Sequence, residues 1–137
     1  MIYITRRESF NAAHRLFRPE LNDEENLQLF GKCSNPNWHG HNYTLFVTVK
    51  GNINPQTGLL INLKELSTVI KSEIIDKVDH KNLNIEVDFM QGVLASTENI
   101  AVKIWEQLDV AVKNIGAELH CVKVVETENN FVEYFGK

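Results

Sequence analysis

Apolar and polar residues alternate from His41 to Gly51, where the sequence reads HNYTLFVTVKG. Successive side chains of a strand project to opposite faces, so this period of two predicts a strand with one buried face. Residues 2–13, 119–127 and 131–135 are also rich in β-branched and aromatic residues. They predict three further strands, and the turn-prone residues 128–130 predict that the last two form a hairpin.

In two other segments the apolar residues follow the three-and-four spacing of one helical face. The first predicts a helix from about 63 to 77, with apolar residues at Leu63, Leu66, Val69, Ile70, Ile74 and Val78. The second begins after Ser96 or Thr97, either of which can cap it, and ends before Gly116. Its apolar stripe consists of Ile100, Ala101, Ile104, Trp105 and Leu108.

The remaining segments predict loops. Residues 18–37 are polar and irregular, with two prolines, a glycine and several acids, which indicates a long functional loop. The order ββααββ predicts one α+β domain over residues 1–137, a four-stranded antiparallel sheet covered on one face by two helices. Such a sheet leaves its edges unpaired, so we expect copies of the chain to associate.

Composition narrows the class of protein. A hydrophobic fraction of 43% and a charged fraction of 23% are ordinary for a soluble globular domain. The net charge of −4, without long runs of like charge, argues against a general nucleic-acid surface. No stretch resembles a membrane span or a secretory signal, so we expect a cytoplasmic protein without a membrane partner. Cys33 and Cys121 lie in different contexts and do not suggest a disulfide framework.

The segment CSNPNWHGH at residues 33–41 carries the clearest chemistry. His39 and His41 are two positions apart at a strand start, so their rings share one face about 6.5–7 Å apart and can reach one ion. If the first two strands form a hairpin, His14 lies beside them. Three histidines leave one tetrahedral position open, as in catalytic zinc sites. A cupin site would need a carboxylate ligand shortly after His41, and no acid follows until Glu65.

Other candidate residues keep two interpretations each. Cys33 is either a fourth ligand that closes a structural zinc site or a free thiolate activated by the metal. The pair Asp79-His80 is either a proton relay or a helix cap. Glu126 ends an apolar strand, where it either faces solvent or anchors a polar ligand. Cys121 is expected to be a small core residue.

Six sequence blocks, in order, resemble those of the 6-pyruvoyl/6-carboxytetrahydropterin synthase family, which has the tunnelling fold (T-fold). They cover nearly the whole chain: SFNAAHRL at 9–16, GKCSNPNWHGHNY at 31–43, LLINLKEL at 59–66, VDHKNLN at 78–84, STENIA at 96–101 and VVETENN at 124–130. The resemblance implies a zinc enzyme that removes triphosphate from 7,8-dihydroneopterin triphosphate and gives 6-pyruvoyltetrahydropterin without an external redox cofactor. It also implies a homohexamer of two trimers, with active sites at subunit boundaries.

The resemblance also implies roles for individual residues. The zinc ligands would be His14, His39 and His41. The catalytic groups would be Cys33 and the relay Asp79 and His80. The substrate-binding residues would be Glu126, which anchors the pterin ring, and the flanking pair Thr97 and Glu98. Arg15 or Lys32 would meet the triphosphate.

Two alternatives stay open. A related enzyme, 6-carboxytetrahydropterin synthase of queuosine biosynthesis, uses the same substrate and ligands but has a Cys-x3-His-Gly-His spacing, whereas this chain has Cys-x5-His-Gly-His. The longer spacing favours the pyruvoyl product. Trp38 stands where the biopterin-type enzymes usually have glycine, and a bulky ring there would alter the pocket. In the second alternative, Cys33 completes a Cys-His₃ tetrahedron in a non-catalytic structural zinc domain.

Overall fold

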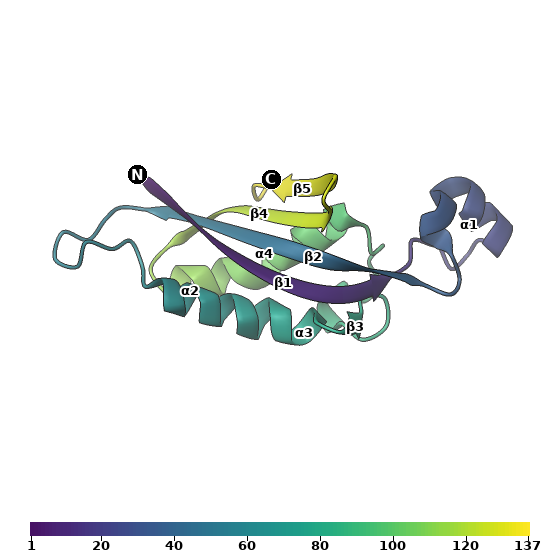
Figure 1. Cartoon of the computed structure of the whole chain (residues 1–137), viewed down its shortest axis with the longest axis horizontal. Coiled ribbons are helices and arrows are strands. Elements are labelled where there is room, and N and C mark those ends of the chain that lie inside the picture. The colour runs from purple at the N-terminus through teal and green to yellow at the C-terminus, as the bar shows by residue number, and fades with distance from the viewer.

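The computed structural model describes residues 1–137 and contains a five-stranded mixed sheet with the strand order β3-β1-β2-β4-β5 (Figure 1). β1 pairs antiparallel with β2, β2 with β4, and β4 with β5, whereas β3 is parallel to β1. The strands are β1 (Ile2–His14), β2 (His39–Gly51), β3 (Lys81–Asn82), β4 (Glu118–Thr127) and β5 (Asn130–Tyr134).

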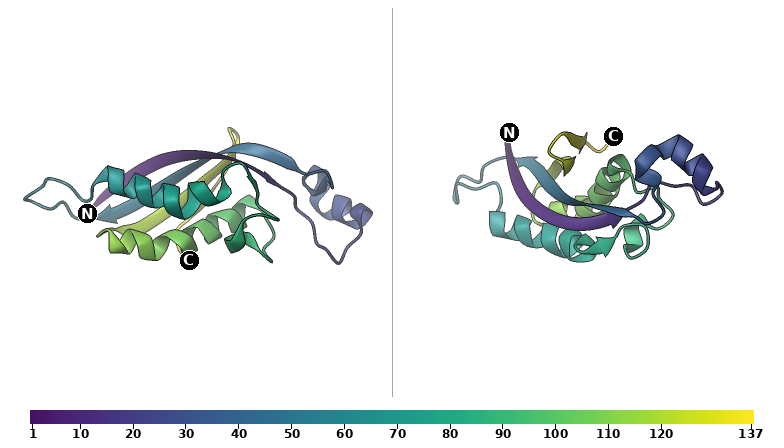
Figure 2. Two further views of the ribbon diagram at one scale, coloured as in Figure 1. Left: turned by 90° about the horizontal axis from the view of Figure 1, so that it is seen from below. Right: turned by 45° about the vertical axis from the view of Figure 1, so that its right-hand side comes forward.

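Two long helical segments cover one face of this sheet, as the view from below in Figure 2 shows. In the first, α2 (Leu63–Ile70) continues through a π-helical turn (Lys71–Ile75) into α3 (Asp76–Val78). The second is α4 (Thr97–Asn114), capped by the Ser96 side chain, which accepts the Asn99 N–H. Both predicted helices are therefore confirmed. None of the helices combines the length and apolar composition that crossing a bilayer would require.

The prediction of a four-stranded antiparallel sheet with two helices was wrong in two respects. The sheet has a fifth strand, β3, which pairs in parallel with Ala12 and Ala13 of β1. A strand of two residues is too short to give a periodic pattern in the sequence. There is also a third helix, α1 (Asp23–Phe30), within the segment predicted to be a loop, followed by a 3₁₀ turn (Gly31–Ser34).

Helix α1 was missed because it has no buried apolar stripe. Its one buried residue is Asn26, which hydrogen-bonds to backbone carbonyls before and at the helix start. A capping box starts the helix: the Asn22 side chain accepts the Glu25 N–H, and the Glu25 carboxylate accepts the Asn22 N–H. The capping hydrogen bonds at its start, rather than the burial of an apolar face, therefore stabilise this helix.

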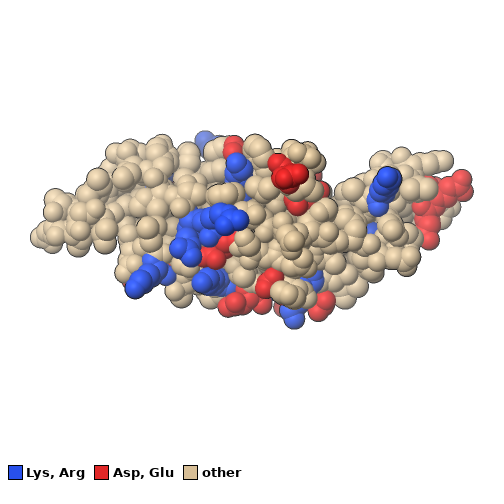
Figure 3. Space-filling model, in the orientation of Figure 1, with Lys and Arg blue, Asp and Glu red and all other residues tan.

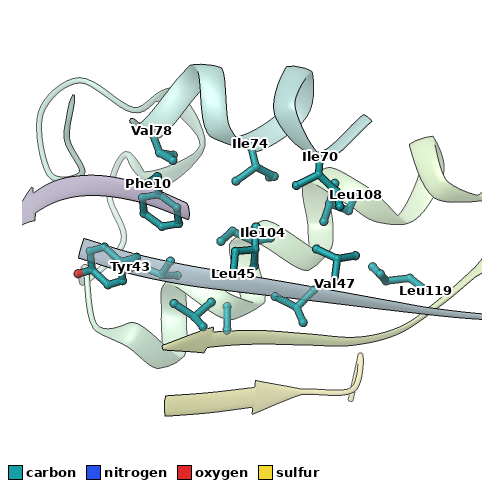
Figure 4. Packing of buried hydrophobic residues seen from close by; sticks show 14 of the residues in the cluster. Phe10, Tyr43, Leu45, Val47, Ile70, Ile74, Val78, Ile104, Leu108 and Leu119 are labelled. Carbon is teal, nitrogen blue, oxygen red and sulfur yellow. The ribbon is translucent and has the colours of Figure 1, made fainter. Parts of the chain in front are cut away.

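The core lies between the sheet and the helices. The alternation along β2 buries Tyr43, Leu45, Val47 and Val49. Figure 4 shows the first three of these facing residues of the helical layer. The opposite face of the sheet carries polar pairs, such as the hydroxyls of Thr5 and Thr48 at 2.7 Å. Cys121 is buried, as expected for a core-like residue.

The register of β1 and β2 assembles the site residues. His14 pairs with His39 at the far end of both strands, and Ala12 pairs with His41. A Cβ atom at Gly40 would lie 3.2 Å from the Ala12 carbonyl oxygen, closer than most real Cβ contacts. Glycine therefore lets β1 and β2 approach closely where the three histidines meet.

Candidate metal centre and its pocket

The three predicted histidines come together. One ring nitrogen from each of His14, His39 and His41 lies within 4.8 Å of the corresponding nitrogens of the other two. His14 and His39 face each other across the β1–β2 pair, and His41 is on the same face of β2 as His39. The hairpin that the sequence suggested is therefore what places His14 beside the other two rings.

Each ring also has a buried nitrogen without a hydrogen-bond partner: Nε2 of His14, Nδ1 of His39 and Nε2 of His41. Buried polar atoms are nearly always paired, so three orphans that converge on one place need an explanation. A metal ion supplies it, because neutral imidazole nitrogens are preferred zinc ligands. The donor set thus fits Zn²⁺ with three protein ligands and an open fourth position.

Burial lowers the pKa of both His14 and His39, and the neighbouring histidines lower them further. Both rings are therefore neutral near pH 7, the state in which imidazole binds metal. His14 is also oriented by a second contact, because its Nδ1 lies 2.7 Å from the Ala95 carbonyl oxygen. A backbone acceptor of this kind fixes the tautomer that leaves Nε2 free for an ion. No pattern in the sequence indicates this contact with Ala95.

Glu126 stands beside the histidines. Its Oε1 is 3.7 Å from Nε2 of His41, and its Oε2 accepts a hydrogen bond from the Thr97 hydroxyl. Glu126 and Glu98 line a recess of about 400 Å³ with Thr97 and the β4–β5 turn. Glu126 is mostly buried, so the interpretation that it simply faces solvent is wrong. The structure brings Glu126, Thr97 and Glu98 to one pocket next to the metal centre.

Cys33 lies in the 3₁₀ turn after α1, where its carbonyl accepts the Leu16 N–H and ties this turn to the end of β1. Its thiol is free and partly exposed. It does not belong to the cluster of three histidine nitrogens. The three histidine nitrogens therefore converge without the thiol, as in an open three-histidine site rather than a closed Cys-His₃ tetrahedron.

Asp79 and His80 form a hydrogen-bonded pair, with Asp79 Oδ2 3.0 Å from His80 Nδ1. Asp79 Oδ1 accepts the Asn11 N–H, and this bond, together with the His80 contacts, lowers the pKa of Asp79. The carboxylate contacts the imidazole, and Asp79 is also the C-cap residue of α3, so neither interpretation excludes the other. The His80 side chain is 82% exposed and the pair makes no hydrogen bond to Cys33. Within one chain, the two groups of the predicted relay lie in contact but make no hydrogen bond to the thiol.

The two basic candidates differ in availability. The Arg15 guanidinium lies over the Phe17 ring at 4.1 Å, donates to the Ser34 carbonyl and pairs with Asp23. It is thus committed to holding the turn that carries Cys33. Lys32 is exposed and has no ion-pair partner. Figure 3 shows acidic side chains gathered at the α1 end of the molecule, where Asp23, Glu24 and Glu25 lie without a basic residue in the helix.

Trp38 has a backbone φ of 70°, in the left-handed region that favours glycine. A hydrogen bond from its N–H to the Asn35 carbonyl closes the turn before β2, and its ring packs edge-on against Phe17 at 6.3 Å. The two rings border a mainly apolar cavity of about 520 Å³ that also includes Met90 and Leu94. A bulky side chain thus occupies a strained position directly before His39, one of the three candidate ligands.

Comparison with known proteins agrees with this geometry. Residues 3–137 match the family model of 6-pyruvoyl tetrahydropterin synthase. The human 6-pyruvoyl tetrahydrobiopterin synthase is 50% identical over 134 residues, which cover 98% of this chain and 91% of the human one. The 6-carboxy-5,6,7,8-tetrahydropterin synthase of Bacillus subtilis is 31% identical over 109 residues, 76% of this chain and 70% of that one.

A solved structure is similar over almost the full length. The 6-pyruvoyl tetrahydropterin synthase of Caenorhabditis elegans superposes with a TM-score of 0.91 at 38% identity, covering 99% of this chain and 96% of that one. The overall fold of this chain, with its five-stranded sheet and helical layer, therefore matches that of a solved structure.

Proposed function

Because the chain belongs to the 6-pyruvoyl tetrahydropterin synthase family, we propose that it eliminates triphosphate from 7,8-dihydroneopterin triphosphate and rearranges the product to 6-pyruvoyltetrahydropterin. The proposal makes it a zinc-dependent carbon–oxygen lyase in a tetrahydrobiopterin-type pathway. One observation carries it: the orphaned nitrogens of His14, His39 and His41 converge beside Glu126, at the edge of a pocket of about 400 Å³.

The pocket suits a flat heterocycle with adjacent N–H groups. The carboxylate of Glu126 can accept two hydrogen bonds, from a ring amide N–H and an exocyclic amine, in a charge-assisted bidentate contact. The Thr97 hydroxyl holds that carboxylate in place, and Glu98 lies at the pocket rim. These contacts would fix the ring so that its side chain extends toward the three histidines.

His14, His39 and His41 would hold the zinc ion. When bound, Zn²⁺ supplies Lewis acidity toward the hydroxyl groups of the substrate side chain. Cys33 then moves a proton between carbon and oxygen, which requires a thiol that is not itself a ligand. Hydrogens shift within the substrate, so the overall conversion needs no external redox cofactor.

The relay of Asp79 and His80 suggests why the active site would include more than one chain. Within one chain this pair is solvent-exposed and bound to Asn11 rather than to Cys33. In a hexamer with sites at subunit boundaries, His80 of one copy would approach Cys33 of another. The hexamer and the cytoplasmic location stay predictions of this proposal.

Two alternative functions are each disfavoured by a specific observation. The 6-carboxytetrahydropterin synthase reaction is disfavoured by the longer Cys-x5-His-Gly-His spacing and by the lower identity and coverage of the Bacillus subtilis relative. A structural zinc domain is disfavoured because Cys33 stands outside the histidine cluster.

Substitution of Cys33 by alanine tests the enzyme against the structural zinc domain. We expect Cys33→Ala to keep about one zinc ion per chain while turnover of the triphosphate substrate is lost. Elemental analysis of the purified variant, beside wild type and His39→Ala, measures the metal. Loss of zinc from Cys33→Ala, together with a large fall in stability, would instead support the closed structural site.

A further inference from the structure

Tyr43 is the third residue of a series on one face of β2, after the ligands His39 and His41. Alternate residues of a strand share a face, so Tyr43 follows the metal ligands at the next position inward. Its side chain is fully buried, and its ring stacks on Phe10 with 4.9 Å between ring centroids. The ring is therefore fixed by the core, while the end of the side chain approaches the metal centre.

The Tyr43 hydroxyl is buried and has no hydrogen-bond partner. In Figure 4 its oxygen points away from the aliphatic side chains of the core. The Tyr43 ring lies edge-on to His41 at 5.5 Å and to His14 at 5.9 Å. Thr44 pairs with Val125, so Tyr43 and Glu126 are the next residues along their strands and lie at the same level. The unpaired hydroxyl is thus enclosed by the groups that form the proposed site.

We propose that the Tyr43 hydroxyl donates a hydrogen bond to an oxygen atom of the substrate side chain, held between Glu126 and the three histidines. This inference rests on the proposed function, because it assigns a further catalytic group to the same site. A buried donor left without a partner is costly, and bound substrate would remove that cost. The Thr97 hydroxyl cannot take this role, since it already donates to Glu126.

The phenol is placed to donate, because the core fixes its ring and its hydroxyl has no other partner. A neutral donor fixed beside an oxygen that gains negative charge during reaction lowers the barrier without any reorganisation of its own.

The test compares wild type with Tyr43→Phe, which removes one oxygen atom and keeps the ring that stacks on Phe10. The probes are neopterin, whose side chain carries hydroxyl groups, and 6-methylpterin, whose side chain has no oxygen. We expect Tyr43→Phe to bind neopterin about tenfold more weakly. Its affinity for 6-methylpterin should not change, and its kcat should fall about 100-fold. Its thermal midpoint should be equal to or above that of wild type, since a buried unpaired hydroxyl is gone.

Tyr134→Phe is the matched control. Tyr134 lies on β5, where its ring packs against Trp105 and does not reach the pocket. This variant should match wild type for both ligands. Equal affinity of Tyr43→Phe and wild type for neopterin, or an equal loss for both pterins, would overturn the role of the hydroxyl. If zinc-loaded wild type bound neither pterin, the proposed function itself would fail. The comparison of Tyr43→Phe with wild type bears only on the role of the hydroxyl, so the two failures can be told apart.

Discussion

Two features of individual residues at this site destabilise the folded chain. Buried imidazole nitrogens without partners destabilise the metal-free chain, and Trp38 holds a backbone conformation that costs a residue with a Cβ atom about 1–2 kcal/mol. Both costs are concentrated at the same candidate metal centre. Strain and unpaired polar groups in native proteins cluster at functional sites, which is where this chain has them.

The first residue-scale prediction concerns pH. His14 and His39 have folded-state pKa values below the ordinary 6.5, so the unfolded chain binds protons first as the pH falls. The contribution of these two neutral rings to the free energy of unfolding is fully present above pH 6.5. It is lost as the pH falls below that value toward their folded-state pKa values. The metal-free protein should therefore have a lower free energy of unfolding at pH 5.5 than at pH 7.5, measured by urea unfolding with chelator present.

The double variant His14→Ala, His39→Ala is the control for that measurement. It lacks both titrating rings, so its free energy of unfolding should change less between the two pH values. A metal-free wild type whose stability rises on acidification, or that changes no more than the double variant, would contradict the assignment of neutral, buried rings.

The second residue-scale prediction compares two truncations of Trp38. Both Trp38→Ala and Trp38→Gly lose the contact with Phe17, but alanine keeps the left-handed strain at φ 70° whereas glycine releases it. Glycine also gives the unfolded chain more conformational entropy, which offsets part of the strain energy that it releases. The free energy of unfolding of Trp38→Gly should therefore exceed that of Trp38→Ala by about 1 kcal/mol. Urea denaturation measures the difference, and an alanine variant of equal or greater stability would show that position 38 is not strained.

Sequence reasoning found the residues whose spacing has chemical meaning and missed those defined only in space. His39 and His41 could be paired from strand geometry alone, and His14 could be added from the expected hairpin. Tyr43 was only one position of the predicted strand, because alternation shows which face a side chain takes and not whether its hydroxyl has a partner. The positive φ of Trp38 likewise depends on the turn that its N–H closes with Asn35.

At the scale of elements, β1 and β2 form the frame of the metal centre. Their long antiparallel pairing ends with His14 opposite His39, so the ligands depend on how closely the two strand ends approach. The strand β2 followed from a period of two and the long helices from a period of 3.6, whereas β1, β4 and β5 followed from their β-branched and aromatic residues. The helix α1 and the strand β3 did not, because a capping box and a two-residue bridge leave no periodic signal.

Gly40→Ala tests this frame. The added Cβ would meet the Ala12 carbonyl oxygen at 3.2 Å, so β1 and β2 must separate by a few tenths of an ångström at the ligands. We expect zinc affinity, measured by competition with a chromophoric chelator, to fall roughly tenfold, as for other changes that shift ligand orientation. Ser9→Ala, on the exposed face of β1, is the control. Unchanged affinity in Gly40→Ala would mean that the strand ends adjust freely.

At the scale of the whole molecule, both outer regions of the sheet invite association. β5 forms one edge, and β3 covers only Ala12 and Ala13 of β1, so most of the β1 edge is also unpaired. Unpaired strand edges are templates for other chains. Light scattering at micromolar concentration should give about 94 kDa, the mass of six chains of 15.7 kDa, and a monomer mass would contradict the expected hexamer.

Mixing two inactive variants tests whether the site spans two copies. The single chain leaves His80 exposed and unconnected to Cys33, a separation that no sequence pattern could reveal. If His80 of one copy serves Cys33 of another, unfolding and refolding an equal mixture of Cys33→Ala and His80→Ala should restore about a quarter of wild-type activity. Activity that stays at the level of the separate variants would place both groups in one chain's site.

The central claim is that this chain, with zinc on its three histidines, converts 7,8-dihydroneopterin triphosphate into 6-pyruvoyltetrahydropterin. Incubation of zinc-loaded protein with that substrate, with and without chelator, followed by mass spectrometry of the products, tests it most directly. We expect 6-pyruvoyltetrahydropterin to form only while the metal is bound. Formation of 6-carboxytetrahydropterin and acetaldehyde would contradict the proposed product, and a complete absence of turnover would contradict the proposed enzyme.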